Sequence, residues 1–370
     1  MTSVSDITVR NFFRLLRCGT FDTDETIEPM SAYKWRCVSN YAQTHGVDHL
    51  MHKGAARCAE QFFMQLPDDV VEQWKQADAQ ASSDNAHRNE TLAMLTPMLQ
   101  QLQARPVLLG AQPATNDILT ACHSDAIDIF FPYSTQGRKA DEWAWNHAEN
   151  IKSPNSGMIT YIYNGTRVTH HHRLLRMANS LHASTLKTIV EEEFRESRPN
   201  MVQLQNTRIE LISPTLQLMR LLLAASTQLL TSGLRLSTLA DMGLLLRNIG
   251  QEVDFVKLQQ WIGRMHLKAM AQLMGQMLAG YLHFEQDEIP FMSHSEALPP
   301  DNVTSSLFQQ PLSGDWHFQQ ASGHVFVSAV GSKAMFRQMR HSARYMHYYP
   351  SEGSASLLSL LAHSLTHIEE

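Results

Sequence analysis

The sequence has only four cysteines, Cys18, Cys37, Cys58 and Cys122, and no two of them have the short spacing of a metal-binding pair. We therefore expect reduced thiols in a cytoplasmic protein rather than a disulfide framework or a zinc site. No apolar run approaches the ~20 residues that span a bilayer. The first residues lack a basic segment followed by an apolar core, so we expect neither a signal peptide nor a membrane partner.

Charge is also scarce, since only 18% of the 370 residues are charged and the net charge is −6. An acidic protein is repelled by the phosphate backbone, so we do not expect nucleic acid to be a partner. One basic segment, with Arg337, Arg340 and Arg344, is an exception. Its pattern fits a helix that holds phosphate and fits a solvated helix face equally well.

The periodicity of the apolar residues changes twice along the chain. Residues 1–104 have helical spacing, residues 105–180 contain short strand-like runs, and residues 181–283 return to helical spacing. Residues 284–370 begin with a proline-containing stretch, which we interpret as a surface linker, and then contain the basic helix. We therefore predict an α+β protein that is predominantly helical, with a small mixed β-sheet core flanked by N- and C-terminal helical regions.

Two short apolar runs, Val107–Leu109 and Ile127–Phe131, are bounded by proline, glycine and polar residues. Short apolar runs with such boundaries are typical of buried strands. Gly110 directly follows the first run and predicts a tight turn there. The second run contains Asp128, a charged residue in an otherwise apolar strand, which makes it a candidate functional residue.

The segment between these strands, Ala114–Cys122, is expected to form a short helix with Thr115 or Asn116 as its N-cap. A helix N-terminus offers N–H groups to an anion. Asp128 on the following strand would hold a divalent cation against that anion. Strand, turn, helix and strand together predict a site for phosphate and metal.

An Asn-Gly dipeptide separates two strand-like runs, residues 158–163 and 166–172. A two-residue Asn-Gly loop between such runs is a strong signal for a β-hairpin. This loop fixes the register so that Tyr161 faces Val168. We expect the hairpin to lie in the same sheet as Ile127–Phe131.

Three successive histidines, His170, His171 and His172, end the second of these runs. On a strand, His170 and His172 share one face and could bind a transition metal. No cysteine or acid adjoins them, so a plain polar strand edge is the interpretation that we favour. Similarly, we interpret the acidic run Glu191–Glu193 as a solvated helix face rather than a metal site.

The strand–turn–strand pattern resembles the core of the DNA polymerase beta-like nucleotidyltransferase superfamily, in particular an uncharacterised bacterial nucleotidyltransferase-like family. In that family the first strand ends in Lys-Gly, and Leu109 stands in place of the lysine. The second strand carries Arg-x-x-Gly-Asp-Ile-Asp. Here Asp128 matches the second aspartate, whereas Ala126 replaces the first, Asp125 the glycine and Cys122 the arginine. The active-site motif is therefore degenerate.

The resemblance extends over most of the chain. A segment from Gly233 to Asp241 is similar to the family's signature, in which a helix ends at glycine and a Leu-Arg motif with aspartate opens the next. Asp241 could pair with Arg235 or Arg247, or could be a structural hydrogen-bonding residue. The strand that carries the third carboxylate in the family has Thr169 at that place.

The resemblance implies nucleotidyl transfer, which needs two carboxylates at positions i and i+2 of a strand to hold two Mg²⁺ ions. Asp125 and Asp128 are separated by three positions and point to opposite faces, unless a bulge at Ala126 realigns them. The candidate residues are Asp128 and Asp125 for catalysis, Asp128 for the metal, and Gly110, Thr115 and Asn116 for the nucleotide.

Three functions remain open from the sequence. The one we favour is a nucleotidyltransferase relative with impaired or lost catalysis, weak or absent Mg²⁺ binding, and a cleft that still takes a nucleoside triphosphate or another partner. The second is an active Mg²⁺-dependent enzyme that modifies an unknown protein or small-molecule acceptor. The third is a structural module for protein interaction.

Overall fold

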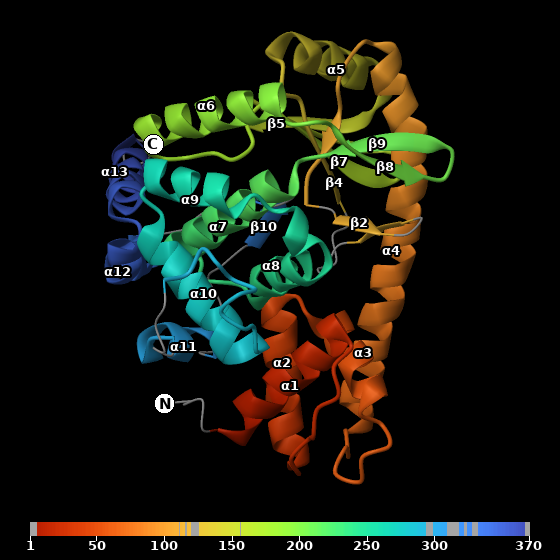
Figure 1. Ribbon diagram of the computed structural model, residues 1–370, viewed down its shortest axis with the longest axis vertical. Helices are drawn as coiled ribbons and strands as arrows, with labels where there is room; N and C mark the ends of the chain where they lie inside the picture. Colours follow the sequence, from red (N-terminus) through yellow and green to blue (C-terminus); the bar gives the residue numbers. More distant parts are fainter. Residues whose placement is uncertain are drawn as a thin grey trace.

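Figure 1 shows the computed structural model, which describes residues 6–110, 112–114, 117–119, 126–155, 157–293, 299–308, 318–321, 324–327 and 332–366. The chain begins with four helices: α1 (Ile7–Phe21), α2 (Ala32–His45), α3 (Asp48–Arg57) and α4 (Asp68–Gln101). Helix α4 has 34 residues and runs along one side of the molecule, from the other N-terminal helices to the sheet (Figure 1).

The centre of the fold is a seven-stranded mixed sheet with the order β5-β6-β7-β4-β1-β9-β8. Strand β4 pairs with β7 in parallel and with β1 antiparallel, and β1 pairs with β9 in parallel. These pairings confirm the predicted α+β fold with a mixed sheet. The strands are β1 (Val107–Leu108), β4 (Ala126–Phe130), β5 (Glu149–Asn155), β6 (Met158–Tyr163), β7 (Thr166–His171), β8 (Asn200–Leu204) and β9 (Thr207–Leu211).

The predicted Asn-Gly hairpin is confirmed. Strands β6 and β7 are joined by Asn164 and Gly165, which both have positive φ angles, and Tyr161 pairs with Val168. Strand β7 lies directly beside β4, so the hairpin belongs to the same sheet as Asp128.

The expected helix at Ala114–Cys122 is wrong. Its described residues instead form a two-stranded hairpin of β2 (Gln112–Ala114) and β3 (Asp117–Leu119), with Ala114 paired to Asp117. A nine-residue helix is marginally stable without packing, whereas paired strands satisfy each other's backbone groups. Thr115, Asn116 and Asp125 lie outside the described residues.

A second hairpin occupies residues that we expected to belong to a helical bundle. Strands β8 and β9 pair antiparallel, with Val202 opposite Ile209, and Gln205 in the loop has φ +50°. Burial along β8 has the two-residue period of a strand, since Val202 and Leu204 are buried while Met201 and Gln203 are exposed. The parallel pairing of β9 with β1 then extends the sheet past residue 180.

Helices cover both faces of the sheet. On one face, apolar residues of α4 and of α5 (Ser134–His147) pack on Ile127 and Ile129 of β4. On the other face, Phe130 belongs to the larger core that includes α6 (Ser180–Glu196) and α7 (Pro214–Thr231). The side chains of β4 alternate between these two cores, so Asp128 lies on the same face as Phe130, toward α7.

The helical part behind this face is centred on α7 (Figure 1). Its other helices are α8 (Leu236–Ile249), α9 (Phe255–Arg264), α10 (Lys268–Leu282), α11 (Asp301–Leu307), α12 (Ser332–Tyr345) and α13 (Pro350–Thr366), with short 3₁₀ turns at Gly250–Glu252 and Met346–Tyr348 and a hairpin of β10 (Phe318–Ala321) and β11 (His324–Val327). In the described part of the chain, no helix is long and apolar enough to cross a bilayer.

The stretch after α10 is not the surface linker that we predicted. Phe284, Ile289 and Met292 are buried in the main core, because the turns of this stretch place their side chains against the helices. The basic segment does form a helix, α12, as predicted. Arg340 and Arg344 on α12 are exposed.

Helix α13 is tied to the start of α6. The Glu352 carboxylate on α13 accepts hydrogen bonds from the backbone N–H groups of Ala178 and Asn179, the latter at 3.1 Å. The ring of His182 on α6 stacks on Tyr349 with 4.9 Å between centroids. The first turn of α6 therefore depends on residues near the end of the described chain.

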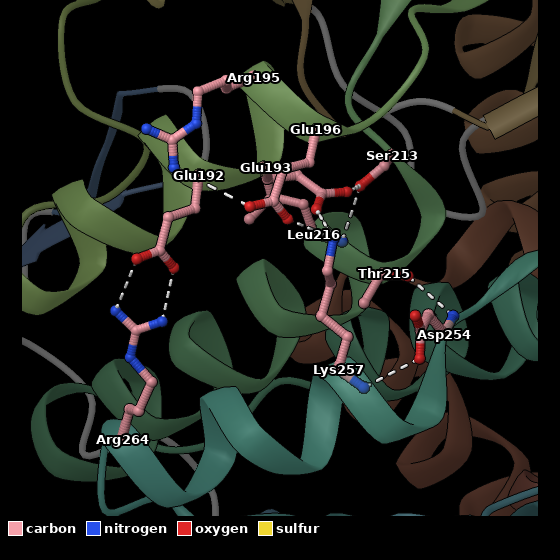
Figure 2. Close-up of polar contacts among 10 residues, drawn as sticks. All are labelled: Glu192, Glu193, Arg195, Glu196, Ser213, Thr215, Leu216, Asp254, Lys257 and Arg264. Carbon is pink, nitrogen blue, oxygen red and sulfur yellow. Dashed lines mark hydrogen bonds and ion pairs between the residues drawn. The ribbon is translucent and has the colours of Figure 1, made fainter.

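The acidic run on α6 is only partly the solvated face that we predicted (Figure 2). Glu192 pairs with Arg264 of α9, with 2.6 Å between Oε2 and Nη1. Glu193 is buried, accepts a hydrogen bond from Ser213 and pairs with Lys257 Nζ at 2.8 Å. Since Ser213 is also the N-cap of α7, Glu193 joins three helices rather than facing water.

Candidate functional site

Asp128 lies in the middle of β4 and faces the helices behind the sheet. Its Oδ1 is 2.8 Å from Nε2 of His171, which is on the adjacent strand β7 and whose side chain is almost fully buried. The side chain of Asp128 itself is 18% exposed. A carboxylate beside a buried imidazole can accept a proton or orient the ring, so this pair is the starting point of the candidate site.

The neighbours of Asp128 on the same face supply no second carboxylate from the strand. These neighbours are Ala126 and Phe130, as the two-residue period of a strand requires. The register with β7 is continuous from Ala126 to Phe130, so β4 has no bulge in this range. Thr169 is opposite Asp128 on β7, is fully buried, and its Oγ1 is 3.2 Å from that of Thr160.

Arg220 of α7 reaches the same place from the helical side. Gly110, directly after β1, has φ +75°, and a methyl group added to it would lie 3.4 Å from Nη2 of Arg220. The N–H of Leu109 donates to the carbonyl of Asp128 at 2.9 Å. The turn at Gly110 therefore lies next to Asp128, and the absence of a side chain there leaves room for the guanidinium.

Two carboxylates act on the charge of Arg220. Burial lowers the pKa of Arg220, while the negative charges of Asp128 and of Asp241, on α8, oppose that shift. The guanidinium is also held by Gln217, whose Oε1 accepts from Nε at 3.2 Å. An arginine remains protonated in proteins, so the site contains a fixed cation that feels the charge of acids from two different elements.

Arg220 was not among the residues predicted from the sequence. Arg235 and Arg247 were considered as partners of Asp241 because they are close to it in the sequence. The charge of Asp241 also acts on Arg220, which belongs to the preceding helix. One signal was present: Arg220 is the only charged residue in Pro214–Thr231. A single charge in such an apolar helix needs a partner.

The other two histidines of the run point to the opposite face. His170 Nδ1 is 3.0 Å and His172 Nε2 is 2.7 Å from the two carboxylate oxygens of Asp141 on α5. Tyr161 adds its hydroxyl, 2.7 Å from Nε2 of His170. His170 and His172 thus share a face as predicted. The interpretation as a strand edge is wrong, because β7 lies between β6 and β4 and His170 is fully buried.

Burial and hydrogen bonding set the protonation of this second cluster. Desolvation lowers the pKa of His170, although Asp141 partly opposes the change. For Asp141, burial would raise the pKa, but the hydrogen bonds from His170 and His172 outweigh it and the net direction is down. Among the residues that the structure describes, no group of three or more His, Cys, Asp or Glu side chains is arranged to hold a metal ion.

The donors that the structure describes around Asp128 do not fit the pair of Mg²⁺ ions used for nucleotidyl transfer. Mg²⁺ prefers oxygen ligands in octahedral geometry. Here one oxygen of Asp128 accepts from His171, the same-face positions of β4 are a methyl and a phenyl group, and the nearby charge from α7 is positive. Of the predicted nucleotide-binding residues, Gly110 lies at this site, while Thr115 and Asn116 lie outside the described residues.

The comparisons with known proteins show the family of the chain. The model of an uncharacterised nucleotidyltransferase family matches residues 31–283, which include the whole sheet and helices α2 to α10. No curated protein and no solved structure matches the chain significantly. Because the family model matches more than half of the chain, and because the strand with Asp128 lies within the match, the chain belongs to this nucleotidyltransferase family.

Proposed function

We propose that this member of the family has lost two-metal nucleotidyl transfer but keeps a cleft that binds a nucleotide or another partner. The observation that carries the proposal is the isolation of Asp128 on β4. Its same-face neighbours are Ala126 and Phe130, in a strand whose register is continuous. Two metal ions need carboxylates on the same side of a strand, and β4 offers one.

The surroundings of Asp128 support the loss of catalysis. In transfer by two metals, the carboxylate must hold ions that activate the attacking hydroxyl and the leaving phosphate. Asp128 instead accepts a hydrogen bond from His171 at 2.8 Å. Thr169, opposite Asp128, has a hydroxyl at the place where the family has its third carboxylate. A hydroxyl cannot replace a carboxylate as a ligand that neutralises Mg²⁺.

The retained cleft is supported by the turn at Gly110 and by the polar groups around it. Gly110 has a left-handed backbone conformation and faces Arg220. Arg220, Asp128 and Asp241 are each partly accessible to solvent. A partly exposed set of charged groups between a sheet and a helical layer is a common place for a ligand. The family suggests a nucleoside triphosphate as the ligand class.

The experiment incubates the protein with radiolabelled nucleoside triphosphates, with Mg²⁺ or Mn²⁺ and with a cell lysate as the source of acceptors. We expect no label to be incorporated into protein or small molecules. Asp128→Ala is the test variant, and Asp69→Ala, at an exposed position on α4, is the matched control. Label that appears with the wild type and with Asp69→Ala, but not with Asp128→Ala, would show that the enzyme is active.

The binding part of the proposal is tested by thermal unfolding with each nucleoside triphosphate. A ligand that binds the folded state raises the melting temperature by mass action. We expect a shift that is lost in Gly110→Val, because a β-branched side chain at φ +75° would be strained and would occupy the space beside Arg220. The absence of a shift with every nucleotide would contradict nucleotide binding.

A further inference from the structure

Arg220 is partly buried at a place where a metal-dependent relative would need a divalent cation. It is the only charged residue in Pro214–Thr231, so the helix places a single positive charge against the sheet. Its guanidinium lies beside the Gly110 turn, with Nη2 at 3.4 Å from the position that a methyl group on Gly110 would take. The carbonyl of Asp128 accepts from Leu109, the residue directly before that turn.

The charges around this guanidinium come from both sides. Asp128 contributes a carboxylate from the sheet and Asp241 contributes one from α8, and both act on Arg220. His171 adds an N–H that donates to Asp128. In a partly buried site, carboxylates without a cation would repel each other, and a divalent metal or a basic side chain can supply the positive charge. Here the chain supplies it.

We propose that Arg220 is a built-in cation that takes the place of the divalent metal ion of this cleft and keeps Mg²⁺ and Mn²⁺ out. The inference rests on the proposed loss of two-metal catalysis and adds the group that replaces the metal. An ion approaching Asp128 meets a fixed positive charge, and the guanidinium occupies the space beside Gly110. The ligand of the cleft is therefore bound without a metal ion.

This proposal predicts that the metal site returns when the cation is removed. In Arg220→Met, the side chain keeps an unbranched apolar stem but loses its charge. Asp128 and Asp241 are then left without this cation, and a divalent ion can compensate for them. Arg220→Lys keeps the positive charge and should not bind the ion.

The experiment titrates each variant with Mn²⁺ alone and follows free Mn²⁺ by its electron paramagnetic resonance signal. We expect the wild type and Arg220→Lys to leave the signal unchanged, and Arg220→Met to bind Mn²⁺ about tenfold more tightly or better. Adding Asp128→Asn to Arg220→Met should abolish the gain. The matched control is Arg36→Met, which removes an exposed arginine paired with Asp69 on the distant helices α2 and α4.

If Arg220→Met is too unstable for the Mn²⁺ titration, a double-mutant cycle of melting temperatures with Asp128→Asn still tests the proposal. We expect Arg220→Met to lower the melting temperature. Adding Asp128→Asn should restore part of the loss, because it removes one of the two negative charges that the side chain at position 220 no longer offsets. Purely additive effects of the two substitutions would overturn the proposal. So would Mn²⁺ binding by the wild type that disappears in Asp128→Asn.

The outcomes of this experiment are separate from those of the transfer assay. A wild type that transfers label refutes the proposed function, whatever Mn²⁺ does in the variants. A wild type without transfer, combined with an Arg220→Met variant that folds and gains no Mn²⁺, leaves the proposed function standing and refutes only the role of Arg220.

Discussion

His170 and His171 are neighbours on β7, yet the two faces of the sheet to which they belong are built differently. His170 faces α5 and is enclosed with Tyr161, Asp141 and His172, and each of its ring nitrogens has a partner. His171 faces the helices on the other side and meets Asp128, whose environment includes the charge of Arg220. We call these the closed face and the cleft face.

The two faces differ in the role of their polar groups: on one face these groups stabilise the fold, and on the other they are available to a ligand. On the closed face, one carboxylate satisfies two imidazoles, and the ring of His170 packs on Phe131 and Tyr161. On the cleft face, two acids and a guanidinium gather where solvent has access. Buried polar groups that are fully paired are stabilising as a network, while charged groups gathered where solvent has access are candidates for a functional site.

The largest expected effect tests the closed face. Asp141→Ala leaves His170 and His172 without their shared acceptor, and breaking a buried pair from one side costs about 3 kcal/mol. Urea unfolding measures the loss. The control is Glu142→Ala, which removes an exposed carboxylate from the next position of α5. Equal losses in the two variants would show that the network on this face is not stabilising.

Acid should weaken the same face. Because desolvation lowers the pKa of His170 in the folded state, the unfolded chain binds a proton first as the pH falls below about 6.5. The free energy of unfolding then falls by up to about 1.4 kcal/mol per pH unit for this group. His45, buried between α2 and α8, adds to the slope, since burial lowers its pKa to about 4.

Unfolding in urea between pH 7.5 and pH 5 measures this dependence. His170→Gln should reduce the change of the unfolding free energy with pH, and the part that comes from His45 should remain. A slope that is the same in the wild type and in His170→Gln would contradict the assignment. Asp141 does not contribute in this range, because its lowered pKa makes its stabilisation disappear only below about pH 4.

A smaller effect is expected from the hydroxyl of Tyr161. Tyr161→Phe removes the partner of Nε2 of His170 and should cost about 1 kcal/mol of unfolding free energy. Tyr163→Phe is the matched control on the same strand, since the hydroxyl of Tyr163 donates to a thioether, Sδ of Met98, at 3.3 Å in an exposed contact. If Tyr163→Phe lowers the free energy of unfolding more than Tyr161→Phe does, the assigned role of the Tyr161 hydroxyl is wrong.

The smallest effect is expected on the cleft face. Asp128→Asn keeps the shape of the side chain, and we expect it to change the free energy of unfolding by about 0.5 kcal/mol or less. Residues of functional sites are often not optimal for stability. Their charged and polar groups are placed to meet a ligand rather than to stabilise the fold. A loss as large as that of Asp141→Ala would show that the cleft face is as structural as the closed one.

The sequence predicts those parts of the fold that depend on local pattern. The Asn-Gly loop predicts the β6–β7 hairpin with its register, and helical spacing predicts the N-terminal helices, because both signals lie within a few neighbouring residues. The same reasoning fails for β9, whose parallel partner β1 is far away in sequence. Local pattern also cannot show that β7 is an inner strand, so His170 was placed at an edge.

The candidate site also consists of residues that local sequence predicts and residues that only tertiary packing places. Asp128 and Gly110 were predicted, since one is an acid in an apolar strand and the other a glycine after a strand. Arg220 and Asp241 were not placed there, because only the packing of α7 and α8 against the sheet brings their charges to Asp128. Tertiary packing between distant segments determines this half of the site, and no local period encodes it.

The contact of Glu352 with the start of α6 has a consequence for how the protein is made. Ala178 and Glu352 are separated by 174 positions in the sequence. A ribosome adds about 5–20 residues per second, so the first turn of α6 waits roughly ten to thirty-five seconds for its acceptor. The family match ends at residue 283, well before Glu352 is translated. The nascent chain therefore completes the first turn of this helix only after Glu352 has been translated.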